Sequence, residues 1–267
     1  MRWIKGIVGG LLGLLLLGLI LLVGLILVDE VSGPKTVDFA NVTYSSQDGL
    51  TLLGYLARPE GDGPFPAVLM LHEWWGLNEG ITELADALAE QGYIVFVPDA
   101  YRGRLATQIP LALYLRLSTP DAKIHADLDA GLDYLRGLAD VDPARVATVG
   151  FCFGGEQSLQ MSLRRPDDLA ATVMLYGSLV TEAARLGPLR DQPFLGIFGA
   201  TDAQIPVSEV RAFEAALNSL NAPATITIYE GVGHAFVTER NYNQPGAAGE
   251  AWQQISDFLA LHLQSDG

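Results

Sequence analysis

The sequence predicts an α/β fold with a mostly parallel central sheet, helices on both faces of the sheet, and one transmembrane helix in front of it. Three observations lead to this prediction. Residues 7–28 contain only isoleucine, valine, leucine and glycine. Two candidate strands around a short turn follow soon afterwards. From there to the C-terminus, short apolar runs alternate with stretches whose apolar residues recur at helical spacing, which is typical of a parallel sheet.

The run at 7–28 is predicted to be a membrane anchor. Its 22 residues would form a helix roughly 33 Å long at about 1.5 Å per residue, against a hydrocarbon core of about 30 Å. A cleaved signal sequence is one alternative, but its apolar region is usually about 7–15 residues long and is followed by a small-residue cleavage pattern. A buried helix of a soluble domain is the other, and it would need apolar surroundings on every side.

Charges at the ends of the run predict its orientation. Arg2 and Lys5 precede the run, and acidic residues follow it. Because positively charged flanks stay in the cytoplasm, residues 1–6 are expected there and the rest of the chain on the extracytoplasmic side. Residues 29–35 then form a short linker, and residues 36–267 form one large domain close to the membrane.

Composition argues against nucleic-acid binding and against a metal centre. The chain has 16 basic and 31 acidic residues and a net charge of −15, which repels a phosphate backbone. Its single cysteine makes no intrachain disulfide and no cysteine-rich metal site. His72-Glu73 begins an H-E-x-x-H zinc motif, but Gly76 stands where the second histidine would be. No metal or organic cofactor is expected.

The domain begins with two antiparallel strands and continues as alternating strands and helices. Continuous apolar runs such as P-A-V-L-M-L-H at 66–72 are typical of strands buried on both faces. The helix at 78–91 shows a helical apolar stripe behind a capping Asn78. The segment at 103–119 fits neither pattern and is predicted to be a short helix or a flap near the site. Strands are predicted at 36–46, 50–58, 66–72, 93–97, 145–149, 170–176, 193–198 and 224–229, and helices at 78–91, 120–138, 154–164, 207–220 and 247–263.

The turn after the strand at 145–149 carries the first candidate catalytic residue. It reads G-F-C-F-G-G and places Cys152 between a strand and a helix, as in a nucleophile elbow with cysteine in place of serine. Such a sharp turn needs small residues two positions before and after the nucleophile, which Gly150 and Gly154 supply. The helix N-terminus is expected to lower the pKa of the thiol and favour the thiolate. A buried structural cysteine is the alternative.

Two later strand ends carry the expected partners of Cys152. The strand at 193–198 leads to Asp202, and the strand at 224–229 leads to His234. This order of nucleophile, acid and histidine is that of strand–elbow–helix hydrolases. His234 would act as the base toward Cys152, and Asp202 would fix the tautomer of His234 and stabilise its protonated form. A turn or cap aspartate and a structural histidine are the alternatives.

Three motifs together resemble the dienelactone hydrolase family, α/β-hydrolases with a Cys-His-Asp triad. The motifs are G-F-C-F-G-G around Cys152, G-A-T-D-A-Q-I-P around Asp202 and G-V-G-H-A-F around His234. The resemblance covers residues 36–264 approximately. It implies an α/β-hydrolase fold and action on a small ester or lactone.

The resemblance assigns further roles next to the triad. In the family, a glutamate at the place of Glu73 contacts the resting thiol and takes part in its activation, and a carboxylate there can accept the thiol proton. A loop carboxylate without a catalytic role is the alternative. The backbone N–H groups of Trp74 and Phe153 would form the oxyanion hole. Trp74 and Trp75 either line an apolar mouth or pack beneath the following helix.

Substrate-binding residues are predicted at Tyr101, Arg102 and Trp75. In dienelactone-cleaving members, one arginine that holds the substrate carboxylate follows a P-D-x-Y segment, to which Arg102 or Arg104 corresponds. The other lies four residues after the histidine, where this chain has Thr238. The missing arginine and the net charge of −15 make a neutral ester or lactone at least as plausible as an anionic dienelactone.

The sequence therefore predicts a membrane-anchored hydrolase whose Cys152 forms a thioester that water releases. Two alternatives stay open. One is a tethered, non-catalytic binding module that keeps the fold, and the other is an acyltransferase or thioesterase that uses the same three residues. The expected partners are a small-molecule ester or lactone and the membrane, but no nucleic acid, and the oligomeric state is left open.

Overall fold

The computed structural model of the protein describes residues 2–264, which contain one eight-stranded sheet with the order β1-β2-β4-β3-β5-β6-β7-β8. The pairs β1–β2 and β2–β4 are antiparallel, and the remaining pairs are parallel. This confirms the predicted mostly parallel sheet. The strands are β1 (Val42–Ser45), β2 (Thr51–Ala57), β3 (Phe65–Leu71), β4 (Ile94–Pro98), β5 (Val141–Phe151), β6 (Ala171–Leu175), β7 (Phe194–Gly199) and β8 (Ala224–Tyr229). The helices are α1 (Arg2–Ser32), α2 (Glu79–Ala89), α3 (Ile109–Ser118), α4 (Asp121–Arg136), α5 (Phe153–Arg164), α6 (Val207–Ser219) and α7 (Ala247–Leu259).

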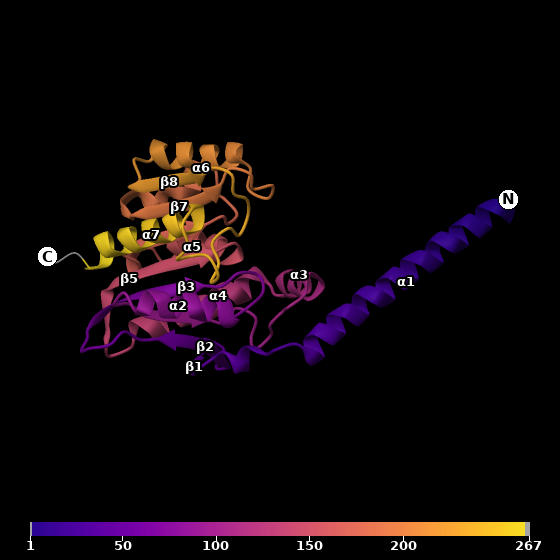
Figure 1. The fold of residues 1–267 in the computed structure, drawn as a ribbon, viewed down its shortest axis with the longest axis horizontal. Helices are drawn as coiled ribbons and strands as arrows, with labels where there is room; N and C mark the ends of the chain where they lie inside the picture. The colour runs from indigo at the N-terminus through magenta and orange to yellow at the C-terminus, as the bar shows by residue number, and fades with distance from the viewer. Residues whose placement is uncertain (1, 265–267) are drawn as a thin grey trace.

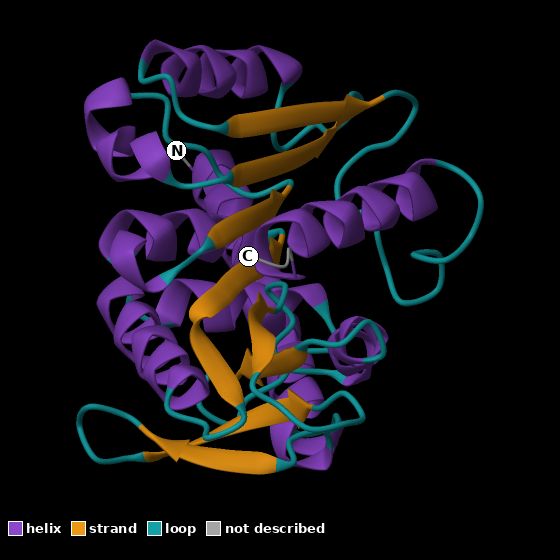
Figure 2. Cartoon of the chain, turned by 90° about the vertical axis from the view of Figure 1, so that its left-hand side faces the viewer, coloured by secondary structure: helices purple, strands orange, loops and turns teal. Residues whose placement is uncertain are grey.

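Alternate side chains of the central strands enter separate cores on the two faces of the sheet. In β3, Val68 and Met70 belong to a core that α2 and α7 complete. The neighbouring residues Leu69 and Leu71 point the other way, into a core that includes residues of α3, α4 and α5. Helices accordingly lie on both sides of the sheet (Figure 2). Burial on both faces explains why these strands are continuous apolar runs rather than alternating ones.

The first predicted strand, at 36–46, is shorter in the structure. Thr36–Asp38 forms a single 3₁₀ turn, closed by a hydrogen bond from the Lys35 backbone N–H to the Asp38 carboxylate at 2.7 Å. The Asn41 side chain then bonds both backbone groups of Leu56, at 3.0 and 2.8 Å. These side-chain bonds take the place of strand pairing, so regular pairing begins only at Val42.

The segment at 103–119, for which the sequence shows no clear pattern, contains helix α3. Its inner side is buried through Leu111, Ala112 and Leu115. Its outer side is also apolar, with Leu113 and Leu117 exposed. Because a helical stripe is recognised by the contrast between an apolar and a polar face, a helix that is apolar on both sides escapes detection.

Helix α1 projects away from the domain as one long helix, and only its C-terminal end meets the body (Figure 1). Between residues 11 and 28 its side chains are exposed, apart from partial shielding at Gly24 and Ile26. Within residues 2–264, it is the one helix long and apolar enough to cross a membrane by length and composition. The predicted N-terminal helix is thus present, and its crossing of a membrane stays a prediction.

Candidate active site

The turn between β5 and α5 holds Cys152 in a strained backbone conformation, with φ 53° and ψ −113°. The turn is tight enough to exclude side chains on both sides of the cysteine. A Cβ atom on Gly150 would lie 2.0 Å from the carbonyl oxygen of Gly154, and one on Gly154 would lie 2.0 Å from that of Leu71. This is the geometry of a nucleophile elbow, which lifts the side chain of Cys152 above the edge of the sheet.

Cys152, His234 and Asp202 form one chain of contacts at the carboxyl ends of the parallel strands. The Nε2 atom of His234 lies 3.0 Å from Sγ of Cys152, and its Nδ1 atom lies 2.8 Å from the Asp202 carboxylate. The other oxygen of that carboxylate accepts the backbone N–H groups of Gln204 and Ile205, at 2.7 and 3.1 Å. Asp202 is therefore fixed by its own loop and orients the imidazole ring toward the thiol. The structure brings together the three residues that the sequence singled out.

The resting thiol is held in its protonated form. Burial raises the pKa of Cys152 to about 12, and the nearby Glu73 carboxylate adds to the rise. The backbone N–H of Phe153, at the start of α5, acts in the opposite direction but is the weaker influence on this pKa. The N–H at the helix start lowers the pKa as expected, but the expectation of a net lowering that favours the thiolate is wrong, because burial of the thiol outweighs it.

The thiol opens into a cavity of about 510 Å³. Its walls come from loops that follow five different strands and from helices α3 and α5. Trp75 lines this cavity together with Trp74, and the two indole rings meet edge to face at 5.1 Å. Of the two arrangements considered for these tryptophans, the structure therefore shows the one in which they line the mouth. The residues lining the cavity are Glu73, Trp74, Trp75, Arg116, Cys152, Phe153, Glu156, Tyr176, Ser178, Gln204, Ile205, His234 and Ala235.

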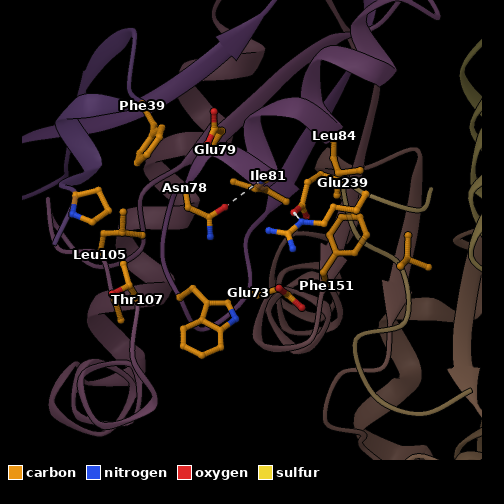
Figure 3. Close-up of a pocket in the computed structure, with 16 residues that line it drawn as sticks. Phe39, Glu73, Asn78, Glu79, Ile81, Leu84, Leu105, Thr107, Phe151 and Glu239 are labelled. Carbon is orange, nitrogen blue, oxygen red and sulfur yellow. Dashed lines mark hydrogen bonds and ion pairs between the residues drawn. The ribbon is translucent and has the colours of Figure 1, made fainter. Parts of the chain in front are cut away.

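Glu73 and Trp75 also line a second cavity, of about 420 Å³, that lies toward the linker and α2 (Figure 3). Burial raises the pKa of Glu73 to about 7, and the carboxylate of Glu239 across this second cavity adds to the rise. Among the described residues, no hydrogen bond joins the Glu73 side chain to Cys152. Glu73 thus acts on the thiol through its charge, while His234 makes the direct contact.

Two backbone N–H groups are available beside the thiol. Trp74 lies three residues after the end of β3, and its N–H makes no backbone hydrogen bond within residues 2–264. The N–H of Phe153 is the first of α5, and the first N–H groups of a helix have no acceptor inside the helix. The two groups flank the elbow from neighbouring strands, as a site for a developing oxyanion requires.

Comparison with known proteins agrees with this geometry. Residues 52–263 match the dienelactone hydrolase family. The chain belongs to this family. A protein of Salmonella typhimurium named "Putative carboxymethylenebutenolidase" is 30% identical, over 84% of this chain and 87% of its own. A protein of the same name from Methylorubrum extorquens is 29% identical, over 80% and 77%.

A solved structure shares the fold as well as the sequence. The crystal structure titled as a putative dienelactone hydrolase from Klebsiella pneumoniae is 31% identical and superposes with a TM-score of 0.71. It covers 82% of this chain and 99% of its own. The predicted α/β-hydrolase fold is confirmed, and the chain is a dienelactone-hydrolase-like hydrolase.

Two of the predicted substrate-binding residues lie outside the cavity. The guanidinium of Arg102 donates two hydrogen bonds, at 2.6 and 2.7 Å, to the carboxylate of Asp127, which is 1% exposed. Arg102 has φ 54°, and this left-handed backbone turns its side chain toward α4 rather than toward Cys152. Tyr101 is buried beneath the elbow, where its ring stacks on Phe153 at 5.6 Å. Neither residue touches the space that a substrate would occupy.

The positions that bind a carboxylate in dienelactone-cleaving members are thus used differently here. Arg104 forms an ion pair with Glu30 at 2.8 Å. Thr238 stands four residues after the histidine, and its hydroxyl and N–H both contact the Asn241 side chain, at 3.1 and 2.8 Å. The first position thus keeps an arginine whose guanidinium is paired elsewhere, and the second carries a threonine.

The structure places further residues in the cavity that the sequence did not single out, among them Tyr176, Arg116 and Glu156. Tyr176 directly follows β6, has φ 37°, and packs its ring against His234 at 5.2 Å. Its position at the end of a predicted strand could have marked Tyr176 as a candidate. Arg116 reaches the cavity from α3, and Glu156 from α5. Arg116 lies in the segment without a sequence pattern, so no local signal marked it.

We predict that Arg102 stabilises the fold and takes no part in substrate binding. Arg102→Met leaves the buried carboxylate of Asp127 without its partner, so the free energy of unfolding in urea should fall by about 3 kcal/mol. The control Arg211→Met removes an exposed ion pair with Glu214 and should cost less than about 1 kcal/mol. A raised KM for ester substrates in the folded Arg102→Met enzyme would instead assign substrate binding to this residue.

We predict that Glu73 suppresses the reactivity of the resting thiol in a pH-dependent way. Glu73→Gln removes the charge that raises the pKa of Cys152, so iodoacetamide should alkylate the variant faster than the wild type above pH 7. The pKa of Glu73 is about 7, so the wild-type carboxyl becomes neutral at lower pH and the difference should shrink there. Glu79→Gln, on the rim of the second cavity, is the matched control. Equal alkylation rates at every pH would exclude this role for Glu73.

Proposed function

We propose that the protein hydrolyses carboxylic ester or lactone bonds of small neutral molecules through Cys152, with a thioester intermediate. The observation that carries this proposal is the continuous contact from Asp202 through His234 to Cys152, at 2.8 and 3.0 Å, at the floor of a cavity. The matching relatives support it, because the curated ones described above are named after an enzyme that cleaves a lactone.

In the first half of the reaction, Sγ of Cys152 attacks the carbonyl carbon while its proton passes to Nε2 of His234. Because the pKa of the thiol is about 12 at rest, the nucleophile is generated by this transfer rather than stored as a thiolate. The N–H groups of Trp74 and Phe153 bind the oxygen as it becomes negative. The carbon–oxygen bond to the alcohol then breaks, and His234 returns its proton to the departing oxygen.

In the second half, water hydrolyses the thioester. His234 removes a proton from the water as the water oxygen attacks the carbonyl carbon, and the same N–H groups bind the oxyanion. The carbon–sulfur bond breaks, and the proton held by His234 returns to Sγ of Cys152. The products are a carboxylic acid and an alcohol, or one hydroxy acid from a lactone. Asp202 stabilises the protonated imidazole in both halves.

The charges around the cavity favour a neutral substrate. Among the described residues that line the cavity, Arg116 is the one arginine or lysine, and its guanidinium lies 2.8 Å from the carboxylate of Asp121. Glu73 and Glu156 line the same cavity. An anionic substrate would meet two carboxyl groups and an arginine that already has a partner, whereas a neutral ester meets no such repulsion.

The proposal includes anchoring of the domain to a membrane by α1. The length of the helix, its exposed apolar surface and the basic residues before it support a single span with the hydrolase domain on the extracytoplasmic side.

The central test of the proposed mechanism is Cys152→Ala. Turnover of neutral p-nitrophenyl esters by the full chain should fall by about 10⁴-fold or more, because the bond-forming atom is removed. The circular dichroism spectrum should stay unchanged, since the elbow backbone is retained. Mass spectrometry of the wild type with a slowly released ester should detect one acyl group on Cys152. Full activity of the variant would exclude the mechanism.

The same assay separates the alternative functions. A non-catalytic binding module would turn over no ester, and its thiol would be inert toward iodoacetamide. An acyltransferase would convert the acyl group into a new ester when a competing alcohol is added, whereas a hydrolase releases the free acid.

A second test concerns the substrate charge. We expect a neutral ester to give a higher kcat/KM than the same ester with a terminal carboxylate. Arg116→Gln should change kcat/KM for the neutral ester by less than about threefold, because its ion pair is partly exposed. Lys123→Gln, on α4 outside the cavity, serves as the control. A preference for the carboxylated ester that disappears in Arg116→Gln would instead identify an anionic substrate.

A further inference from the structure

The end of α1 is fixed to the start of α3 by polar contacts. Asp29 is buried, and its carboxylate accepts the backbone N–H groups of Thr107 and Gln108, at 3.0 and 2.9 Å. The Thr107 hydroxyl donates to the same carboxylate at 2.5 Å. Gln108 directly precedes α3, so these bonds tie the end of α1 to the backbone that leads into α3. Glu30 adds the ion pair with Arg104. The direction of α3 relative to α1 is therefore set by the structure.

Helix α3 also reaches back along the apolar part of α1. Ile26 packs against the buried cluster that contains Leu111, Ala112 and Leu115, and the two helices are in contact. Ile26 precedes Asp29 by three residues, which is roughly 4.5 Å along a helix axis. If residues 7–28 span the bilayer, the adjoining part of α3 consequently lies at the boundary of the hydrocarbon rather than in bulk water.

The outer surface of α3 is apolar where it would meet this boundary. Ile109, Leu113 and Leu117 are 60%, 46% and 76% exposed, and their spacing of four residues places them in one stripe. Beside the stripe, Tyr114 is 45% exposed, and the guanidinium of Arg104 lies 5.2 Å from its ring centre. An apolar stripe flanked by tyrosine and arginine is the composition of a helix at a lipid–water interface.

We propose that α3 lies in the lipid–water interface beside α1, with Ile109, Leu113 and Leu117 among the lipid chains. This inference rests on the proposed anchoring by α1. A lipid surface is the occupant because the stripe lies on a helix in contact with the end of α1, whose own exposed apolar side chains extend to Val28 and Val31. Arg116 of the same helix lines the cavity of Cys152, so insertion of α3 holds that cavity at the membrane surface. Esters that partition into the bilayer then reach the thiol directly.

The proposal predicts a selective effect on membrane-borne substrates. Leu113→Gln with Leu117→Gln should reduce turnover of a long-chain p-nitrophenyl ester carried in phosphatidylcholine vesicles several-fold. Turnover of a soluble short-chain ester should stay unchanged. The matched control is Leu50→Gln with Leu261→Gln, two leucines that are also exposed but lie outside α3. Equal loss on both esters would mean that the stripe supports the cavity and not membrane docking.

The position of α3 can be measured without any turnover. Cys152→Ala removes the single cysteine of the chain. One new cysteine then carries a nitroxide label at Leu19 in α1, at Leu117 in α3, or at Asp62 in the exposed loop before β3. The full chain is placed in phosphatidylcholine vesicles, and collisions of each label with oxygen and with a water-soluble nickel chelate are compared. Labels at 19 and 117 should meet oxygen and be shielded from nickel, and the label at 62 should show the reverse.

Each other outcome has one meaning. A label at 117 as accessible to nickel as the label at 62, with 19 shielded, overturns the docking of α3 and leaves the anchor. A label at 19 that nickel reaches overturns the anchor and the docking together. A label at 117 shielded from both reagents and broadened by a second label means that another copy of the chain covers α3. None of these readouts depends on hydrolysis, so failure of the proposed enzymatic function is detected separately.

Discussion

Between β5 and α5 the chain turns so tightly that a Cβ atom on Gly154 would lie 2.0 Å from the carbonyl oxygen of Leu71 in β3. This close approach sets the start of α5 against the end of β3, and the thiol of Cys152 therefore emerges beside Glu73 and Trp74. Strands β6, β7 and β8 extend the sheet in parallel from β5. Their carboxyl ends consequently bring Asp202 and His234 to the same edge. The left-handed backbone at Cys152 is strained, and the packed sheet on both sides holds it in place.

Burial sets the resting charge of the site. It raises the pKa of the Cys152 thiol to about 12 and that of Glu73 to about 7, and it lowers the pKa of His72 to about 4. His72 is thus a neutral structural residue, which accepts the Ala100 N–H at 3.1 Å. A protonated thiol is a poor nucleophile, but it is also poorly reactive toward oxidants, since the thiolate is the species they attack. A proton transfer that occurs only with substrate in place would therefore protect the Cys152 thiol from oxidants between turnovers.

Features encoded locally in the sequence could be predicted, whereas those that depend on distant residues could not. Cys152 and Asp202 each follow a buried strand with a continuous apolar run, and His234 follows the edge strand β8, where isoleucine alternates with threonine. Their meeting at one edge followed from strand order alone. The direction of the Arg102 side chain depends on Asp127, which lies 25 residues further along the chain in α4. The thiol pKa depends on burial, which is a property of the assembled domain and outweighed the local effect of the helix terminus. Tyr176 is an intermediate case. Its position at a strand end can be read from the local sequence, but its contact with His234 depends on the assembled fold.

Helix α3 illustrates how a missing pattern can itself be informative. A helix that has one side on a core and the other in water carries a polar face, and that contrast reveals it in the sequence. In α3, Leu111 and Leu115 face the core, Leu113 and Leu117 face outward, and Arg116 faces the cavity of Cys152. Apolar residues on two sides indicate apolar surroundings on two sides. The domain supplies one of them, and the bilayer that α1 would cross supplies the other. The same absence of contrast that conceals the helix in the sequence thus favours a site that works at a lipid surface.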